Sequence, residues 1–325
     1  MWPALLNNLG NLYEGTQRFG GADKVYSEAL AIRRKLAQDS PAVYLPGVAI
    51  TLNNLGNLYA DTQRFGEADK VYSEALAIRR KLAQDNPAAY LPDLAMTLNN
   101  LGLLYRETQR FDDADKVYTE ALAIRRKLAQ DNPAAYLPGA AITLNNLGIL
   151  YADTQRIGDA DKVYTEALAT YRKLAQDNPA AHLPDLAGTL NNLGILYDRT
   201  QRFGDADRFY TDALAAYRKL AQDSPAAYLP VVAITLNNLG NVYRDTQRFG
   251  EADKVYTEAL AIRRKLARDN PAAFAPDLGQ TLLTAGLVKL KLDSKKEACG
   301  LYAEFRSVNG GDTPEWAAQL ESACR

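Results

Sequence analysis

The side chains with the clearest binding chemistry are pairs of asparagines that recur along the chain. The string Leu-Asn-Asn-Leu-Gly begins at residues 6, 52, 98, 144, 190 and 236, so that every interval is 46 residues. An asparagine amide has two donor hydrogens and two acceptor lone pairs, and it can therefore bond both the N–H and the C=O of a passing backbone. A ladder of such side chains suits the capture of a peptide with little regard to its sequence.

Residues that could support catalysis are scarce. His182 is the only histidine, and it occupies a position that the other copies give to tyrosine or phenylalanine, so we interpret it as a packing residue. Cys299 and Cys324 are the only cysteines; they can pair with each other, but with a single histidine they cannot build a His/Cys metal site or a histidine-based triad. The glycine-rich strings that bind phosphates are also absent. We therefore expect no enzyme activity, no cofactor and no metal.

Charge and hydropathy narrow the class of partner. Lys and Arg number 38 against 39 Asp and Glu, a net charge of -1, which gives no electrostatic case for nucleic acid or an anionic membrane. No stretch approaches the roughly 20 apolar residues of a membrane helix, and the N-terminus does not resemble a secretory signal. The recurring basic run, Arg79-Arg80-Lys81 in the second copy, is balanced by nearby acids and is interpreted as a solvated face. We expect a cytoplasmic protein with a protein or peptide ligand.

Each 46-residue unit predicts two helices that would position the asparagines. In the second copy, apolar residues across 52–59 follow the i, i+3, i+4, i+7 spacing of one helical face. A turn is expected at 62–65, and a second apolar stripe runs over 68–82. The second helix should end near Asn86, because Pro87 has no N–H with which to continue it. Asn86-Pro87 also fits an N-cap followed by a proline at the first position of a new helix.

Particular residues in this unit resemble a known repeat. Leu55-Gly56, Tyr59, Ala68, Tyr72 and Ala75 stand at the offsets of the tetratricopeptide-repeat signature, and the Leu-Asn-Asn-Leu opening with Glu74-Ala75-Leu76 is similar to the kinesin-light-chain-like subclass. The resemblance covers residues 6–306 and implies an all-α, right-handed superhelical solenoid of antiparallel helix pairs. It also implies that the first helices line a concave groove for peptide segments. The period exceeds the usual 34 residues, and we expect the extra length in a longer second helix and its linker.

The resemblance also suggests which residues line that groove. In the family, they are the second asparagine and the residue three positions later. The second asparagines are Asn8, Asn54, Asn100, Asn146, Asn192 and Asn238. The later positions hold Asn11, Asn57, Leu103, Ile149, Ile195 and Asn241, which predicts a groove that is apolar in the middle and polar at its ends.

Differences between the copies follow one face of the first helix. In the second copy the most variable positions are Ile50, Asn57, Ala60 and Asp61, which share one sector at 100° per residue. Selection for a ligand explains this pattern, and so does drift at exposed sites. The asparagines also have a second interpretation, in which residues such as Asn54 tie adjacent repeats together through backbone bonds.

The ends of the chain differ from its middle. We expect six tandem repeats over residues 1–281, a degenerate seventh over 282–306, and a C-terminal capping helix over 307–325 that starts at Asp312-Thr313-Pro314-Glu315. The first repeat has no such cap, which is compatible with truncation of a longer parent or with self-stacking.

Together these patterns predict a scaffold that binds a protein or peptide segment in its groove. Two alternatives remain open. The chain could be a structural protein that forms homo-oligomers through the uncapped N-terminal repeat, or it could be the sensor arm of a larger regulatory enzyme.

Overall fold

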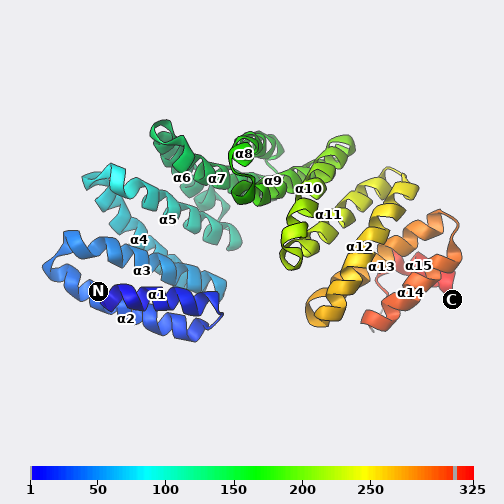
Figure 1. Cartoon of the computed structure of the whole chain (residues 1–325), viewed down its shortest axis with the longest axis horizontal. Coiled ribbons are helices and arrows are strands. Elements are labelled where there is room, and N and C mark those ends of the chain that lie inside the picture. The colour runs from blue at the N-terminus through cyan, green and yellow to red at the C-terminus, as the bar shows by residue number, and fades with distance from the viewer. Residues whose placement is uncertain (1, 310–312) are drawn as a thin grey trace. The chain divides into compact units, whose positions relative to one another are not determined.

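The computed structural model describes residues 2–309 and 313–325, and all regular structure in those ranges is helical (Figure 1). The first helices of the repeats are α1 (Trp2–Gly15), α3 (Pro41–Asp61), α5 (Pro87–Glu107), α7 (Pro133–Asp153), α9 (Pro179–Arg199), α11 (Pro225–Asp245) and α13 (Pro271–Lys291). The second helices are α2 (Phe19–Asp39), α4 (Phe65–Asp85), α6 (Phe111–Asp131), α8 (Ile157–Asp177), α10 (Phe203–Asp223), α12 (Phe249–Asp269) and α14 (Lys295–Asn309). A short 3-10 turn, η1 (Glu315–Ala317), and α15 (Ala318–Cys324) follow.

The chain forms two compact units, residues 1–167 and 168–325, whose boundary falls inside α8. In the first unit each helix from α1 to α7 packs against the next, and each first helix also touches the first helix of the next repeat. In the second unit the same succession runs from α9 to α14, and α9 touches α11. The predicted all-α array of packed helix pairs is confirmed.

The 46-residue period is divided almost equally between the two helices of a repeat. Helices α3 and α4 are both 21 residues long. The residues predicted to form a linker instead open the first helix: Pro87 occupies its first turn, where no N–H is needed, and the side chain of Asn86 accepts a hydrogen bond from the Ala89 N–H. The expected linker was therefore wrong, because both helices share the extra length, whereas the end of the second helix at Asp85 and the cap at Asn86 agree with the sequence.

A compact turn joins the two helices. Gln63 adopts a left-handed φ of 59°. The Arg64 N–H donates to the Tyr59 carbonyl at 2.7 Å and the Gln63 N–H to the Ala60 carbonyl at 2.9 Å, the paired bonds of a Schellman motif. This turn satisfies the last carbonyls of the first helix and brings the two helices of the pair together.

A glycine sets the closeness of each pair. A Cβ added to Gly56 would lie 2.4 Å from Cε1 of Tyr72, so the ring of Tyr72 rests directly on the backbone of α3. Leu52, Tyr72 and Ala75 are buried beside it. The glycine's helix-propensity cost of about 1 kcal/mol is offset by this close approach.

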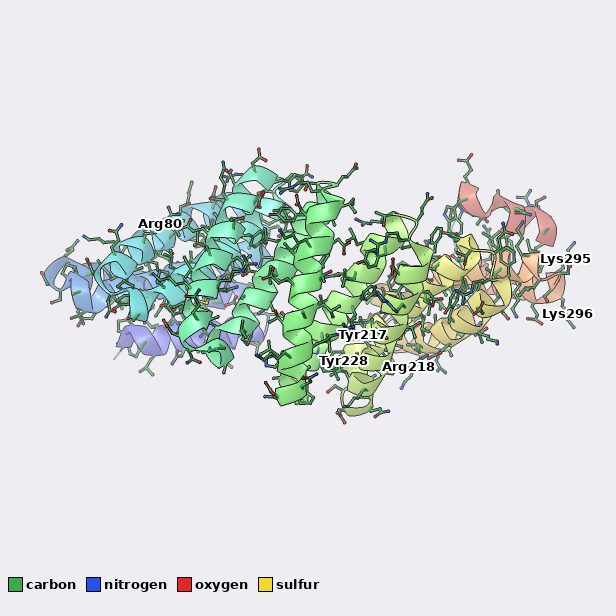
Figure 2. All side chains as sticks on the ribbon, turned by 90° about the horizontal axis from the view of Figure 1, so that it is seen from above. Arg80, Tyr217, Arg218, Tyr228, Lys295 and Lys296 are labelled. Carbon is green, nitrogen blue, oxygen red and sulfur yellow. A yellow bond between two sulfur atoms is a disulfide. The ribbon has the colours of Figure 1, made fainter. Side chains whose placement is uncertain are left out.

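Neighbouring repeats are joined by a polar clamp. Arg79 is only 2% exposed, and it donates to the Asp93 carbonyl at 2.7 Å and to Thr97 Oγ1. Thr97 in turn donates to Asn53 Oδ1 at 3.3 Å. Arg80 projects from α4 and pairs with an acid of the next repeat (Figure 2). The interpretation of the basic run as a solvated face therefore holds for Arg80 but was wrong for Arg79.

The C-terminal end of the second unit is covered by α15, which packs on α13 and α14. Leu320 is fully buried, with its Cδ2 2.7 Å from where a Cβ on Gly286 would lie, and a disulfide joins Cys299 to Cys324. Asp312, where the predicted cap begins, lies outside the described residues. Among those residues the structure has no helix with the length and apolar character needed to cross a membrane.

Candidate functional site

The first unit contains a pocket of about 490 Å³ at the ends of its first helices. Three predicted groove residues, Asn57, Asn100 and Leu103, lie in its wall. The remaining lining residues are Glu14, Ala60, Asp61, Gln63, Tyr72, Leu104, Arg106 and Glu107. Predicted residues of two successive repeats thus share one concave site.

The asparagines of this site are linked to one another between repeats. Asn57 Oδ1 accepts a hydrogen bond from the Tyr72 hydroxyl at 2.6 Å and another from Asn100 Nδ2 at 3.1 Å. One repeat earlier, Asn11 Oδ1 accepts from Asn54 Nδ2, also at 3.1 Å. Residues such as Asn54 do tie adjacent repeats together, but through side-chain amides rather than through backbone bonds.

The first asparagine of the pair is buried in the first three repeats (Asn7, Asn53 and Asn99) and half-buried in the next three. Asn53 accepts bonds from Arg79 and Thr97 within the clamp. In the second unit Asn191 and Asn237 likewise accept from threonines one repeat later. The oxygens of these asparagines are therefore used in bonds between repeats.

The second asparagines differ in accessibility along the first unit. Asn8 is exposed, Asn54 and Asn100 are half-buried, and Asn146 is buried. Asn146 Nδ2 donates to Asn99 Oδ1 at 3.2 Å. The ladder predicted from the sequence is thus uneven, and Asn146 offers little surface to a ligand.

Leu103 breaks the polar pattern. It stands where the previous repeat has Asn57, is 39% exposed and lines the pocket. Tyr72 has Asn57 as its acceptor, but the corresponding Tyr118 hydroxyl is buried with no hydrogen-bond partner among the described residues. Burial raises the pKa of Tyr118 above its ordinary value. An orphaned buried hydroxyl costs about 1–3 kcal/mol, so this repeat presents an apolar side chain at the expense of stability.

The pocket is acidic. Glu14, Asp61 and Glu107 bring three carboxylates to its lining, against the single guanidinium of Arg106. Burial raises the pKa of Glu14, the hydrogen bond from Tyr26 at 2.7 Å lowers it, and the charge of Asp61 raises it further. A mainly polar lining with surplus negative charge and the apolar side chain of Leu103 favours a ligand that carries basic groups and one apolar group.

The remaining predicted residues are less accessible than Leu103. Ile149 in the first unit is half-buried, as are Asn192, Ile195, Asn238 and Asn241 in the second. Asn241 Oδ1 accepts from a tyrosine hydroxyl at 2.8 Å, as Asn57 does.

Charges at the corresponding positions of the second unit are balanced. Asp198 and Asp245 are matched in number by Arg199 and Arg244, and Arg244 bonds Asp245 at 2.8 Å. The surplus of acid is therefore a property of the first unit.

The acidic lining was not singled out by the sequence analysis. Its signal was present nevertheless, because Glu14, Asp61, Arg106 and Glu107 all lie at positions where the copies differ. The orphaned hydroxyl of Tyr118 had no sequence signal of its own; it becomes visible only when the tyrosine is known to reach the position of Leu103 in its own repeat.

The array of helix pairs and its repeat motif agree with the comparisons to known proteins. Models described as tetratricopeptide repeat match residues 3–81, 47–127 and 93–173, and a second such model matches 186–226 and 232–272. The chain belongs to the tetratricopeptide-repeat family. No curated protein sequence is similar enough to count as a relative.

Solved structures place the fold among repeats of this kind. BtubC (BKLC) from P. vanneervenii is 25% identical, with a TM-score of 0.60 over 74% of this chain and 89% of that one. A putative kinesin light chain from Podosopora anserina with nearly identical repeats is 16% identical, with a TM-score of 0.53 over 67% of this chain and 95% of that one. The APC/C hetero-tetramer Cut9-Hcn1 is 16% identical, with a TM-score of 0.54 over 92% of this chain and 53% of that one. The similarity to kinesin-light-chain-like repeats seen in the sequence is confirmed.

Proposed function

We propose that this chain is a non-catalytic interaction scaffold whose first unit binds an extended peptide segment through the pocket around Leu103. The peptide carries an apolar side chain that packs on Leu103 and a basic side chain that meets the pocket carboxylates. The family and the fold support the general role. The residues that line the pocket support the proposed apolar and basic side chains of the peptide.

This proposal rests on one observation: Leu103 stands where the preceding repeat has an asparagine, Asn57. The preceding repeat shows that an asparagine fits this position and satisfies the tyrosine beneath it. Leucine leaves Tyr118 unpaired and exposes apolar surface in a concave site. Local losses of stability are characteristic of functional sites, and exposed apolar surface in a pocket is characteristic of a contact.

The asparagines supply the backbone component of recognition. Asn57 uses its oxygen within the array, whereas Asn100 lies in the pocket wall and donates to Asn57 through Nδ2. Its carbonyl oxygen is the group that can accept from a peptide N–H. Orientation thus comes from the amide, whereas selectivity comes from Leu103 and the three carboxylates.

Matched peptides test this proposal. The probe is a short extended peptide with a central leucine flanked by lysines, and the comparison peptides replace leucine by serine or lysine by glutamate. We expect fluorescence anisotropy to show the leucine-lysine peptide binding at least tenfold more tightly than either comparison. Equal binding of the three peptides would contradict the proposal.

A matched pair of variants locates the binding. Leu103→Asn should weaken the leucine-lysine peptide about tenfold, the scale of one lost apolar contact. Leu292→Asn is the control, because Leu292 is 38% exposed but lies at the end of α13. Equal effects of the two substitutions would place the peptide elsewhere. Replacing Leu103, Ile149 and Ile195 together extends the test to all three predicted apolar positions.

Cytoplasmic location is a further part of the proposal. Thiols are kept reduced in the cytosol, so a cytoplasmic location requires that the disulfide between Cys299 and Cys324 be reduced in the cell. Alkylation of intact host cells followed by mass spectrometry tests this. A quantitatively oxidised pair would contradict a cytosolic location.

A further inference from the structure

One face of α1 is apolar and exposed. Trp2, Leu5 and Leu12 are 59%, 54% and 61% exposed, respectively. At 100° per residue their directions fall within about 80° of one another, so they form a single stripe. We refer to these three residues as the α1 face.

The same positions are buried one repeat later. Val48 and Leu58 are each 1% exposed and Thr51 is fully buried. There the preceding helix pair covers them, since α3 packs on α2 and touches α1. The α1 face therefore has the geometry of a surface that is covered in the rest of the array, and no described residue of this chain covers it.

The polar groups that join ordinary repeats are missing from the α1 face. Thr51 donates to Asn7 Oδ1 and accepts from Arg33. Leu5 stands at the equivalent position and can do neither. A helix pair of the ordinary type would bring an asparagine and an arginine against this leucine and leave both without their partner, which is costly for buried groups.

Arg18, in the turn that follows α1, has also lost a polar partner. Arg64 bonds Asp23 of the preceding repeat and Glu67 of its own. Its counterpart Arg18 lacks the acid of its own repeat, because Gly21 stands there, and among the described residues it keeps only the contact with the Tyr13 ring, at 4.2 Å, that Arg64 also makes with Tyr59. The edge of the α1 face therefore has one acid fewer than the equivalent edge of the second repeat.

The C-terminal end of this chain does not fit as that partner. Helix α15 covers α13 and α14, with Leu320 buried among them. Cys299, which is disulfide-bonded, occupies the position that Asp23 holds in the first repeat. A head-to-tail contact would therefore lack both an open surface and the matching acid.

We infer that the α1 face pairs with the α1 face of a second copy, forming a closed two-fold dimer. Residues 2–13 contain no charged side chain, so two such helices can lie against each other without like-charge repulsion. Two-fold pairing covers both stripes at once and ends the assembly at two copies. The contact involves one helix from each copy, so we expect a small interface and a weak dimer.

Sedimentation equilibrium of the full chain across the micromolar range tests the dimer. The mass should rise with concentration from one to two copies and then level off. The double variant Leu5→Glu with Leu12→Glu should stay monomeric, because four carboxylates would meet at the contact. Val43→Glu is the control, since Val43 is 68% exposed but lies on α3; it should dimerise like the parent chain.

The other outcomes overturn the inference. A parent chain that stays monomeric throughout the range excludes the contact, and a mass that grows past two copies indicates head-to-tail stacking. Dimers that persist in the double variant place the interface elsewhere. Circular dichroism of each variant confirms that the helices are intact. Leu103→Asn should dimerise normally, so failure of peptide binding and failure of dimerisation are distinguishable.

Discussion

Two repeat boundaries, one in each unit, solve the same stacking problem with different residues. In the first unit Arg79 is buried and bonds Asn53 and Thr97 across the repeat boundary. In α10 of the second unit the equivalent position holds Tyr217, which is also buried and whose pKa is raised to about 12, mainly by burial. The next repeat returns to the clamp, because Arg263 is buried and donates to the Asp277 carbonyl. Figure 2 shows Tyr217 of α10 beside Tyr228 of α11. The same position in the repeat therefore accepts either a hydrogen-bonded guanidinium or an aromatic ring. The two arrangements predict different losses of stability when the residue is substituted.

Arg79→Ala should give the largest effect. It removes three hydrogen bonds from a charged donor and leaves a cavity beside buried acceptors, so we expect the free energy of unfolding to fall by about 3–5 kcal/mol. Arg79→Tyr should cost markedly less, because the second unit shows a tyrosine in the same slot. Urea denaturation followed by circular dichroism measures both. If the two variants lose equal stability, the arrangements are not interchangeable and the comparison fails.

Gly56→Ala should come next. The added Cβ would overlap the Tyr72 ring, and overpacking of this kind costs about 1–3 kcal/mol. Gly66→Ala is the matched control, because a Cβ there meets nothing within 4 Å, and it should be neutral or stabilising. Gly194→Ala should match Gly56→Ala, since its Cβ would lie 2.6 Å from Tyr210. Thermal denaturation would show whether the units share this contact; a harmless Gly194→Ala would mean that they do not.

Leu103→Asn should raise stability while it weakens the leucine-lysine peptide. An asparagine would give Tyr118 the acceptor that Asn57 gives Tyr72, a gain of about 1 kcal/mol. A melting temperature that rises together with a loss of affinity is the signature of a residue retained for binding. A clear drop in melting temperature would show that Leu103 is needed for the core.

The smallest effect concerns pH. Burial raises the pKa of Glu14 in the first unit and of Asp198 at the equivalent position of the second. When the pKa of a carboxyl is higher in the folded chain than in the unfolded chain, the carboxyl favours folding most at low pH, where it is protonated in both. This contribution to stability is lost as the pH rises through the pKa of the folded chain. Glu14→Gln and Asp198→Asn should each raise the melting temperature at neutral pH, with the difference vanishing below pH 4. A stability gain that persists unchanged at low pH would contradict this assignment.

Much of the architecture could be predicted from the sequence because it follows from repetition. The spacing of Leu52 and Tyr59, the glycine between them and Pro87 were enough for the helix pair and its approximate ends. The lengths were harder, since Pro87 marks the start of a helix as readily as the end of one. Only the bond from Ala89 to Asn86 distinguishes a linker from a capped first turn.

The polar residues could be predicted less well, because a repeat period does not reveal which way a polar side chain points. Asn53 and Asn54 are adjacent and identical, yet one is buried in the clamp and the other is only half-buried. Arg79 and Arg80 differ in the same way. The exchange of the first arginine for Tyr217, while the charge beside it is retained, was the available sign of a buried position.

The most direct test of the peptide site is to follow leucine and isoleucine methyl signals of the full chain by nuclear magnetic resonance while the leucine-lysine peptide is added. We predict that Leu103 shifts most and saturates with the affinity found by anisotropy, while Leu292 stays unchanged. If Leu103 does not shift, or if the largest changes fall on residues of the second unit such as Ile195, the assignment of the pocket in the first unit is contradicted.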